Sequence, residues 1–175
     1  MNFEIIPAGP EHQLPEVVNC IVEVPKGGSL KFEYDEKYQS FVLDRVLHSP
    51  LFYPCDYGFI PQTRSDDGDH LDVLIAVTLP SFPGAVIPAR PVGMLRMVDD
   101  KGQDFKILAV PIGDPRFKEV ENLEDLGEHI PKEIRHFFEI YKTLEKKTVN
   151  VLGWSGVEDA RAEVLRCVEM YKEIH

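Results

Sequence analysis

Short hydrophobic runs fill the first two thirds of the chain and predict a mainly β structure. Leu30 to Asp35 alternates hydrophobic and polar residues, as in a strand with one buried face, whereas residues 72–79 are almost continuously hydrophobic. Prolines and glycines separate the runs, and many short strands joined by turns favour a barrel or a sandwich. The predicted strands are 16–24, 30–35, 41–47, 72–79, 85–90, 91–98 and 105–110.

The spacing of hydrophobic residues changes near residue 130 and predicts helices in the last third. Ile134, Phe137 and Tyr141 recur at helical intervals behind Pro131, which predicts an amphipathic helix over residues 131–146. We interpret the hydrophobic stripes of this helix and of the closing helix as core packing. A strand over residues 148–154 and a closing helix from residue 157 complete the predicted elements.

The composition is that of an ordinary globular protein, and we expect residues 1–175 to form a single domain. Hydrophobic residues make up 43% of the 175 residues and charged residues 28%, a balance that argues against disorder. The net charge of −11 makes a nucleic acid an unfavourable partner unless cations intervene.

Cysteine usage and hydropathy predict a cytoplasmic protein. The three cysteines are widely spaced and form no CxxC, so neither a disulfide framework nor a thiolate zinc site is expected. Residues 1–16 lack the pattern of a signal peptide, and no apolar run approaches the ~20 residues of a membrane span. We therefore expect a soluble protein with no membrane partner.

Two acidic turns carry the most informative chemistry in the sequence. The first precedes the hydrophobic run at 72–79 and contains Gly68, which lets the backbone turn tightly so that neighbouring carboxylates can converge. The second, around residues 99–104, also lies between two predicted strands and is followed by Lys106. Their carboxylates are Asp66, Asp67, Asp69 and Asp72 in the first turn and Asp99, Asp100 and Asp104 in the second.

Converging carboxylates need a compensating positive charge. Two carboxylates ~5 Å apart repel by about 1 kcal/mol in water and about 3 kcal/mol at an effective dielectric of roughly 20. Mg²⁺, which binds carboxylate oxygens and waters, is the usual compensation, but two separate, solvated turns are an equally open interpretation. Cations and phenols that could bind an anion beside such metals, or could be solvated charges and packing aromatics, are Lys31, Arg45, Tyr53, Tyr57, Tyr141 and Lys142.

Several of these motifs resemble those of one enzyme family. Residues 67–73, DGDHLDV, resemble the D-G-D-P-x-D-V signature of the soluble family I inorganic pyrophosphatases, and the likeness covers nearly the whole chain. One departure is His70, where the family usually has proline or glutamate; because proline would stiffen the loop, we expect loop rigidity or metal affinity to differ. The other matching segments are 21–25, 31–34, 44–45, 52–58, 90–93, 99–106 and 136–142.

The resemblance implies both a fold and an activity. The implied α+β fold is mainly β: a five-stranded, mostly antiparallel, OB-like closed barrel with the C-terminal helices packed outside. The implied reaction is hydrolysis of pyrophosphate to two orthophosphates with Mg²⁺ as cofactor. By resemblance alone, the enzyme is expected to be a homohexamer.

The resemblance also implies roles for individual residues. Asp67, Asp72 and Asp104 would hold a first metal, Asp72 would bridge to a second, and Asp99 and Asp104, with Glu33 more remotely, would serve metals that arrive with the substrate. Lys31, Arg45, Tyr57, Lys106, Tyr141 and Lys142 would bind phosphoryl oxygens, with Tyr53, Glu23 and Asp100 as supporting polar groups. Beside these aspartates, we expect Asp69 to accept the proton of the attacking water, provided that it is not itself bound to the metals.

Three other functions stay open at this point. One is a two-metal hydrolase of nucleotides or polyphosphate, and another is a calcium-binding module without catalysis. The third, an OB-type nucleic-acid binder, needs a basic and aromatic face, which the acidic turns and the net charge of −11 disfavour. Assays of phosphate release distinguish the predicted enzyme from the other hydrolase, which would act on nucleotides or polyphosphate, and from the calcium-binding module, which would release no phosphate.

Overall fold

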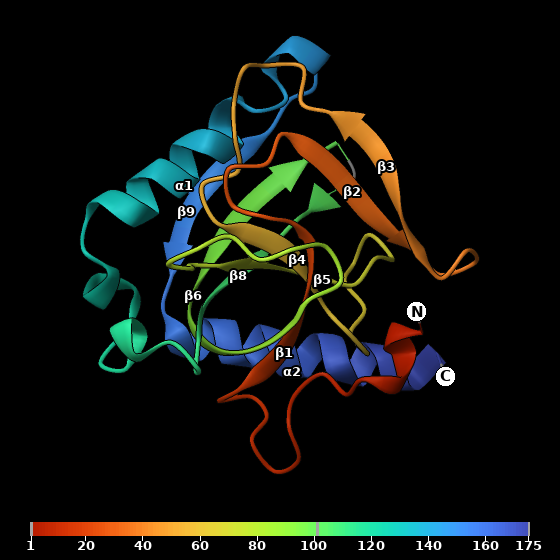
Figure 1. Cartoon of the computed structure of the whole chain (residues 1–175), viewed down its shortest axis with the longest axis vertical. Coiled ribbons are helices and arrows are strands. Elements are labelled where there is room, and N and C mark those ends of the chain that lie inside the picture. The colour runs from red at the N-terminus through yellow and green to blue at the C-terminus, as the bar shows by residue number, and fades with distance from the viewer. Residues whose placement is uncertain (1, 101, 175) are drawn as a thin grey trace.

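The computed structural model describes residues 2–100 and 102–174, which form a mainly β fold with two α-helices (Figure 1). The strands are β1 Val18–Val24, β2 Leu30–Asp35, β3 Ser40–Val46, β4 Asp56–Ile60, β5 Leu71–Ile75, β6 Val86–Asp99, β7 Gly102–Gln103, β8 Lys106–Pro111 and β9 Asn150–Ser155. The helices are α1 His129–Ile140 and α2 Val157–Ile174, with 3₁₀ turns at Phe3–Ile5, Pro115–Phe117, Leu123–Leu126 and Thr143–Glu145. Neither helix is both long and apolar enough, over its described residues, to cross a lipid bilayer.

Five of the strands pair in a circuit with an OB-like arrangement. β1 pairs with β4, β4 with β5, β5 with β8 and β8 with β6, and β6 pairs back with β1. Of these pairs, β5–β8 is parallel and the others are antiparallel. β7 and β9 extend the sheet from β6. The predicted mainly β, OB-like fold class is confirmed.

β6 is one continuous strand where the sequence predicts two, over residues 85–90 and 91–98. Pro91 begins the second predicted strand, and proline donates no hydrogen bond to a sheet. The structure accommodates Pro91 within β6, and the register against β8 shifts between Pro91 and Gly93. The unbroken strand can therefore pair with β1 near its beginning and with β9 near its end.

β4 is a strand that the hydrophobic pattern does not predict. Its residues belong to the aromatic segment 52–58 and the residues that follow, and every one of them is buried, so they show no alternation of hydrophobic and polar positions. Gly58 lies opposite Val22 of β1, where a Cβ atom would stand 1.9 Å from the carbonyl oxygen of Ile21. A side chain at position 58 would therefore push β4 away from β1.

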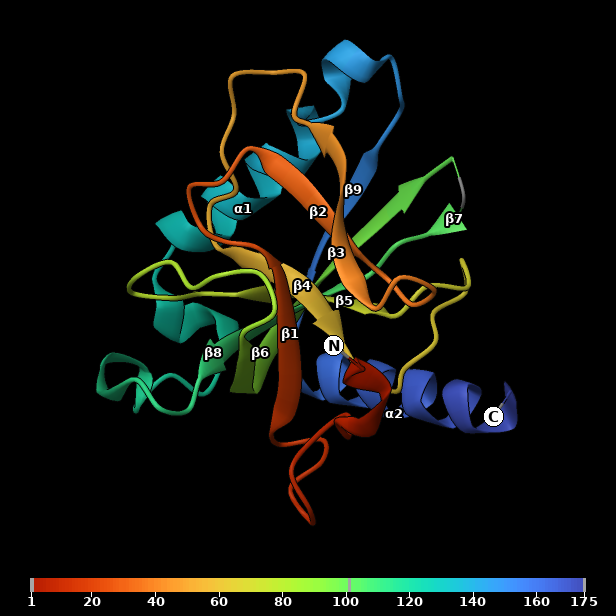
Figure 2. The same cartoon turned by 45° about the vertical axis from the view of Figure 1, so that its right-hand side comes forward.

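β2 and β3 form a separate two-stranded sheet that stands beside the larger one (Figure 2). The hairpin is attached through an aromatic cluster: the Tyr34 ring packs against Phe3, Phe41 and Phe59, with centroid distances of 4.9, 5.7 and 5.9 Å. The Tyr34 ring belongs to this cluster, and Tyr34 also lines the cavity described below together with Lys31 and Glu33.

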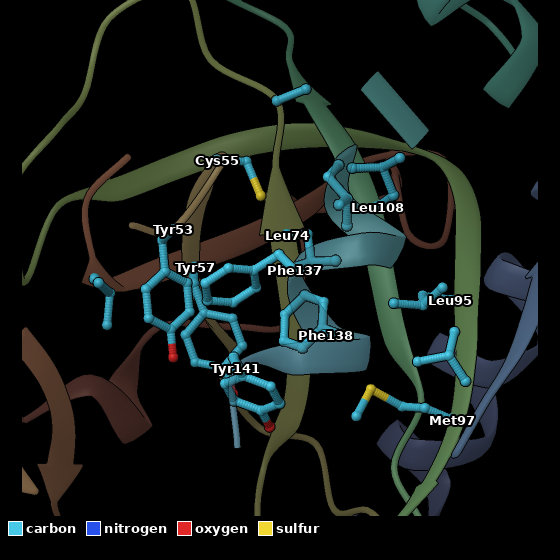
Figure 3. Packing of buried hydrophobic residues seen from close by; sticks show 14 of the residues in the cluster. Tyr53, Cys55, Tyr57, Leu74, Leu95, Met97, Leu108, Phe137, Phe138 and Tyr141 are labelled. Atoms are coloured by element: carbon cyan, nitrogen blue, oxygen red, sulfur yellow. The ribbon is translucent and has the colours of Figure 1, made fainter. Parts of the chain in front are cut away.

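Helix α1 packs its aromatic face onto the main hydrophobic core (Figure 3). Phe137 lies 4.8 Å from Tyr53 and 5.3 Å from Tyr141 between ring centroids. The helix ends at Ile140, earlier than the predicted residue 146. A 3₁₀ turn follows, and Lys146 takes a left-handed conformation with φ of 56°, which directs the chain towards β9.

Helix α2 covers the opposite side of the sheet (Figure 1). Its buried residues are Ala160, Val164, Cys167 and Val168, and they pack in one cluster with residues of β5, β6 and β8. The predicted closing helix is present, but of its predicted inner stripe Val157, Val164, Val168 and Tyr171 only Val164 and Val168 are buried. Helix α2 also contacts the loop that carries the first acidic turn.

Candidate active site

A cavity of about 620 Å³ lies between the main sheet, the β2–β3 hairpin and the end of α1. Both acidic turns face it, together with every residue for which a metal, substrate or catalytic role is predicted above. They are the carboxylates Glu33, Asp67, Asp69, Asp72, Asp99 and Asp104, the cations Lys31, Arg45, Lys106 and Lys142, and the phenols Tyr53, Tyr57 and Tyr141. Of the predicted supporting groups, Glu23 lines the cavity and Asp100 does not.

The parallel pairing of β5 with β8 forms the floor of this cavity. It sets Asp72 directly beside Lys106 in the register of the two strands. The Lys106 Nζ donates to Asp72 Oδ2 at 2.5 Å and to Asp104 Oδ1 at 2.7 Å, and the Tyr57 hydroxyl donates to the same Asp72 oxygen at 2.7 Å. One ammonium thus joins a carboxylate from each acidic turn.

Lys106 carries a full positive charge although it is 2% exposed. Burial by itself lowers its pKa, but the carboxylates of Asp104 and Asp72 outweigh this effect and hold the pKa well above its ordinary value. The ammonium also lies over the faces of Phe138 and Tyr57, 5.4 and 5.6 Å from the ring centroids. It compensates carboxylates that would otherwise repel one another.

Lys142 closes the cavity from the side of α1. Its Nζ donates to Asp99 Oδ2 at 3.1 Å, which joins the end of α1 to the end of β6. Burial alone lowers the pKa of Lys142, but Tyr141 and Asp99 outweigh this and raise it. Tyr141 is 4% exposed and packs against Phe137 and Phe138, so its position depends on the core of α1 (Figure 3).

The loop with the first acidic turn is held by its own backbone. Gly68 takes a φ of 89°, and its N–H donates to Ser65 O at 3.0 Å. The Ser65 N–H donates to Asp69 O at 2.8 Å, and the Asp69 N–H donates to Asp67 Oδ1 at 3.1 Å. Asp66 differs from its neighbours because it pairs with Arg166 of α2 at 2.9 Å.

His70 attaches the end of this loop to the sheet. Its ring stacks on Phe59 at 4.8 Å with an interplanar angle of 13°, and Nδ1 lies 2.9 Å from Thr63 O. Burial lowers the pKa of His70. The loop is thus fixed at this position by ring stacking and a hydrogen bond, where the family resemblance leads one to expect a proline or a glutamate.

The hairpin contributes two cations that are surrounded by carboxylates. Lys31 is paired with Glu33 and lies 3.8 Å from Asp44. Arg45 donates from Nη1 to Asp44 and from Nε to Glu145 Oε1 at 3.0 Å. Burial lowers the pKa of Arg45, but Glu145 and Asp44 outweigh it and raise the pKa.

Glu23 is a buried carboxyl group at the edge of the cavity. It is 7% exposed and accepts a hydrogen bond from the Tyr34 N–H at 2.8 Å. Burial disfavours its charged form and raises its pKa to about 8, while the Tyr34 hydrogen bond opposes this change. At pH 7 the side chain is therefore largely protonated.

The raised pKa of Glu23 predicts that the free energy of unfolding falls as the pH rises. Because the folded state binds the Glu23 proton more tightly than the unfolded state, the stabilisation is complete below the ordinary carboxyl pKa and is lost as the pH rises through about 8. Between pH 5 and pH 8 the wild type should lose roughly 3 kcal/mol relative to Glu23→Gln. Urea unfolding of both proteins in a chelator measures this, and parallel stability curves would contradict it.

The carboxylate oxygens that line the cavity are the type of ligand that a hard divalent cation prefers. Carboxylate oxygens are the preferred protein ligands of Mg²⁺, which usually keeps several waters and takes only one or two carboxylates alongside substrate phosphates. Within residues 2–100 and 102–174, no three His, Cys, Asp or Glu side chains converge as a ready-made metal cluster. Asp72 and Asp104 meet at Lys106 instead.

Comparison with known proteins identifies the family. The model of a protein family described as inorganic pyrophosphatase matches residues 20–172. The chain belongs to the inorganic pyrophosphatase family. It is 46% identical to the inorganic pyrophosphatase of Nostoc sp. over 98% of this chain and 100% of that one, and 50% identical to that of Methanosarcina acetivorans over 86% and 89%. The crystal structure of the Thermus thermophilus inorganic pyrophosphatase superposes with a TM-score of 0.93 at 43% identity, covering 98% and 99% of the two chains.

Membership of the inorganic pyrophosphatase family confirms the prediction of an enzyme that hydrolyses pyrophosphate. It does not favour a hydrolase of another phosphoanhydride or a binding module without catalysis. The roles assigned to individual residues stay predictions, although the structure brings those residues around one cavity.

Sequence reasoning missed residues of this pyrophosphatase site that lie outside the recognised motifs. Arg64 and Lys147 line the cavity, and Glu145 stands behind Arg45. The available signal for Glu145 is weak: it is the one acidic residue within the basic segment 142–147. Its partner lies 100 positions away in the sequence.

Proposed function

We propose that this chain hydrolyses inorganic pyrophosphate to two orthophosphates in this cavity, with Mg²⁺ as its cofactor. The observation that carries the proposal is that negatively charged carboxylates and positively charged side chains line the same cavity. Aspartates of both acidic turns line it together with Lys31, Arg45 and Lys142. The carboxylates can bind the Mg²⁺ ions of a magnesium pyrophosphate, and the basic side chains can bind its phosphoryl oxygens.

The metal-binding side chains would be Asp67, Asp72 and Asp104, with Asp99 and the more remote Glu33 for metals that enter with the substrate. Bound Mg²⁺ would polarise phosphoryl oxygens and lower the pKa of the attacking water. Lys106 keeps Asp72 and Asp104 close together, because its ammonium pairs with both carboxylates.

The chain's own residues would carry the proton and the charge. Asp69 accepts a proton from the water that attacks one phosphorus in line. Negative charge then develops on the departing phosphate, where Arg45, Lys31 and Lys142 stabilise it by charge-assisted hydrogen bonds. Tyr141 adds a phenolic donor beside Lys142, and Tyr53 packs behind Tyr57 in the core. The Tyr57 hydroxyl donates to Asp72 in this structure and would turn to a phosphoryl oxygen when the substrate binds. No covalent phosphoenzyme is required.

We further propose the setting in which this site works. The circuit of five strand pairs forms a closed OB-like barrel, and residues 1–175 act as one pyrophosphatase domain. The cytoplasmic location and the homohexamer also stay predictions; sedimentation equilibrium of the purified chain tests the oligomer.

Phosphate release tests the proposed function directly. With pyrophosphate and Mg²⁺, we expect rapid orthophosphate formation that EDTA abolishes and renewed Mg²⁺ restores. ATP and tripolyphosphate, assayed at the same concentration, should release phosphate much more slowly. Comparable rates with either compound would favour a broader phosphoanhydride hydrolase, and divalent-cation binding without phosphate release would favour a non-catalytic module.

A further inference from the structure

Glu145 is a buried carboxylate that does not line the cavity but contacts a residue that does. It lies in the 3₁₀ turn after α1, and its side chain is 5% exposed. Its Oε1 accepts a hydrogen bond from Arg45 Nε at 3.0 Å, whereas its other ion pair, with the half-exposed Lys147, is longer at 3.9 Å. The contact with Arg45 is therefore the stronger of the two.

The Arg45 guanidinium is held along two of its edges. Glu145 binds Nε, Asp44 binds Nη1, and Nη2 has no hydrogen-bond partner among residues 2–100 and 102–174. Because the guanidinium group is planar, two fixed edges determine the direction of the third. Arg45 lines the cavity, so its remaining donors are available to an anion there.

The same contact joins two separate parts of the site. Arg45 belongs to β3 of the hairpin, which has its own small sheet, and Glu145 follows Tyr141 and Lys142 at the end of α1. The hairpin and this segment approach each other in both views of the chain (Figures 1 and 2). A flexible arginine on a partly exposed strand would otherwise lose much side-chain freedom on binding a phosphate.

A negative charge behind an anion-binding arginine has an electrostatic cost. Through space, the Glu145 carboxylate repels an anionic substrate and neutralises part of the Arg45 charge. If Glu145 acted through charge alone, its removal would improve pyrophosphate binding. Its burial against the guanidinium favours a geometric contribution that exceeds this cost.

We propose that Glu145 is a positioning residue that orients the Arg45 guanidinium towards the phosphoryl oxygens of pyrophosphate and fastens the hairpin to the end of α1. This inference rests on the proposed function. Glu145 does not line the cavity and would act on the substrate through Arg45.

Glu145→Gln tests the proposal because it removes the charge and keeps the shape. We expect kcat/KM for magnesium pyrophosphate to fall by about three- to tenfold, mainly through a higher KM, because a charged hydrogen bond to Arg45 is replaced by a weaker neutral one. The matched control is Glu139→Gln, which breaks an exposed pair with Arg135 on α1 and should leave kcat/KM unchanged. Thermal unfolding of each variant checks that it is folded.

A second pair of variants separates positioning from a structural role. In the Arg45→Ala background, Glu145→Gln should cause no further loss, and kcat/KM should stay equal or rise because a negative charge has been removed. An equal loss in both backgrounds, or a rise in kcat/KM for Glu145→Gln alone, overturns the proposal. If the wild type itself releases no phosphate from pyrophosphate, the proposed function fails first, and the comparison of variants is not reached.

Discussion

Replacing Asp69 with asparagine is expected to lower kcat for pyrophosphate hydrolysis by about 10²–10⁴-fold, with a much smaller change in KM. Asparagine keeps the size of the side chain but cannot accept a proton from the attacking water. The loop should keep its shape, because Asp69 is held in it through backbone atoms: its carbonyl accepts from the Ser65 N–H and its N–H donates to Asp67. Steady-state phosphate release over a range of magnesium pyrophosphate concentrations separates kcat from KM.

Asp66→Asn is the matched control for this prediction. Asp66 is in the same loop, three residues before Asp69, but it pairs with Arg166 of α2 and does not line the cavity. The same chemical change there should leave kcat near the wild-type value. Unchanged turnover in Asp69→Asn would remove Asp69 from the role of general base, and an equal loss in Asp66→Asn would point to a disturbed loop instead.

The fold was predictable where the periodicity of hydrophobic residues within one segment indicates a strand or a helix. The alternation along Leu30–Asp35 and the helical stripe around Phe137 depend on local periodicity, and a strand and a helix are present there. The expected single buried face of the strand is absent, since Leu30 is 42% exposed and the register shifts between Lys31 and Phe32. β4 could not be recognised in this way, because a fully buried strand shows no alternation. In β6, Pro91 is a local signal of a break that the pairing with the surrounding strands overrides.

The site was predictable only where its residues stand close together in the sequence. Asp67 and Asp69 stand in one short motif whose spacing can be read directly, but the order of the strands decides that they face the same cavity as Asp104. The parallel pairing of β5 with β8 sets Asp72 beside Lys106, 34 positions away, and local patterns do not predict that register. The Arg45–Glu145 contact is still more remote, since it joins a hairpin to a turn across 100 residues.

Replacing Asp67 with asparagine should raise the Mg²⁺ concentration needed for half-maximal activity by at least about tenfold. A neutral amide is a poorer ligand for Mg²⁺ than a carboxylate, whereas its oxygen can still accept the Asp69 N–H. Asp104→Asn should have the same direction of effect, with an added disturbance because Asp104 also holds Lys106. A magnesium titration of phosphate release measures the shift, and the Asp66→Asn variant should titrate like the wild type.

The magnesium titration also distinguishes the two predicted kinds of aspartate. If Asp67 is a ligand, saturating Mg²⁺ should restore much of kcat in Asp67→Asn, because the missing affinity is replaced by mass action. If Asp69 is the base, no concentration of Mg²⁺ should restore kcat in Asp69→Asn, since the lost step is a proton transfer. Rescue of Asp69→Asn by Mg²⁺, or an unshifted titration in Asp67→Asn, would reverse or remove these assignments.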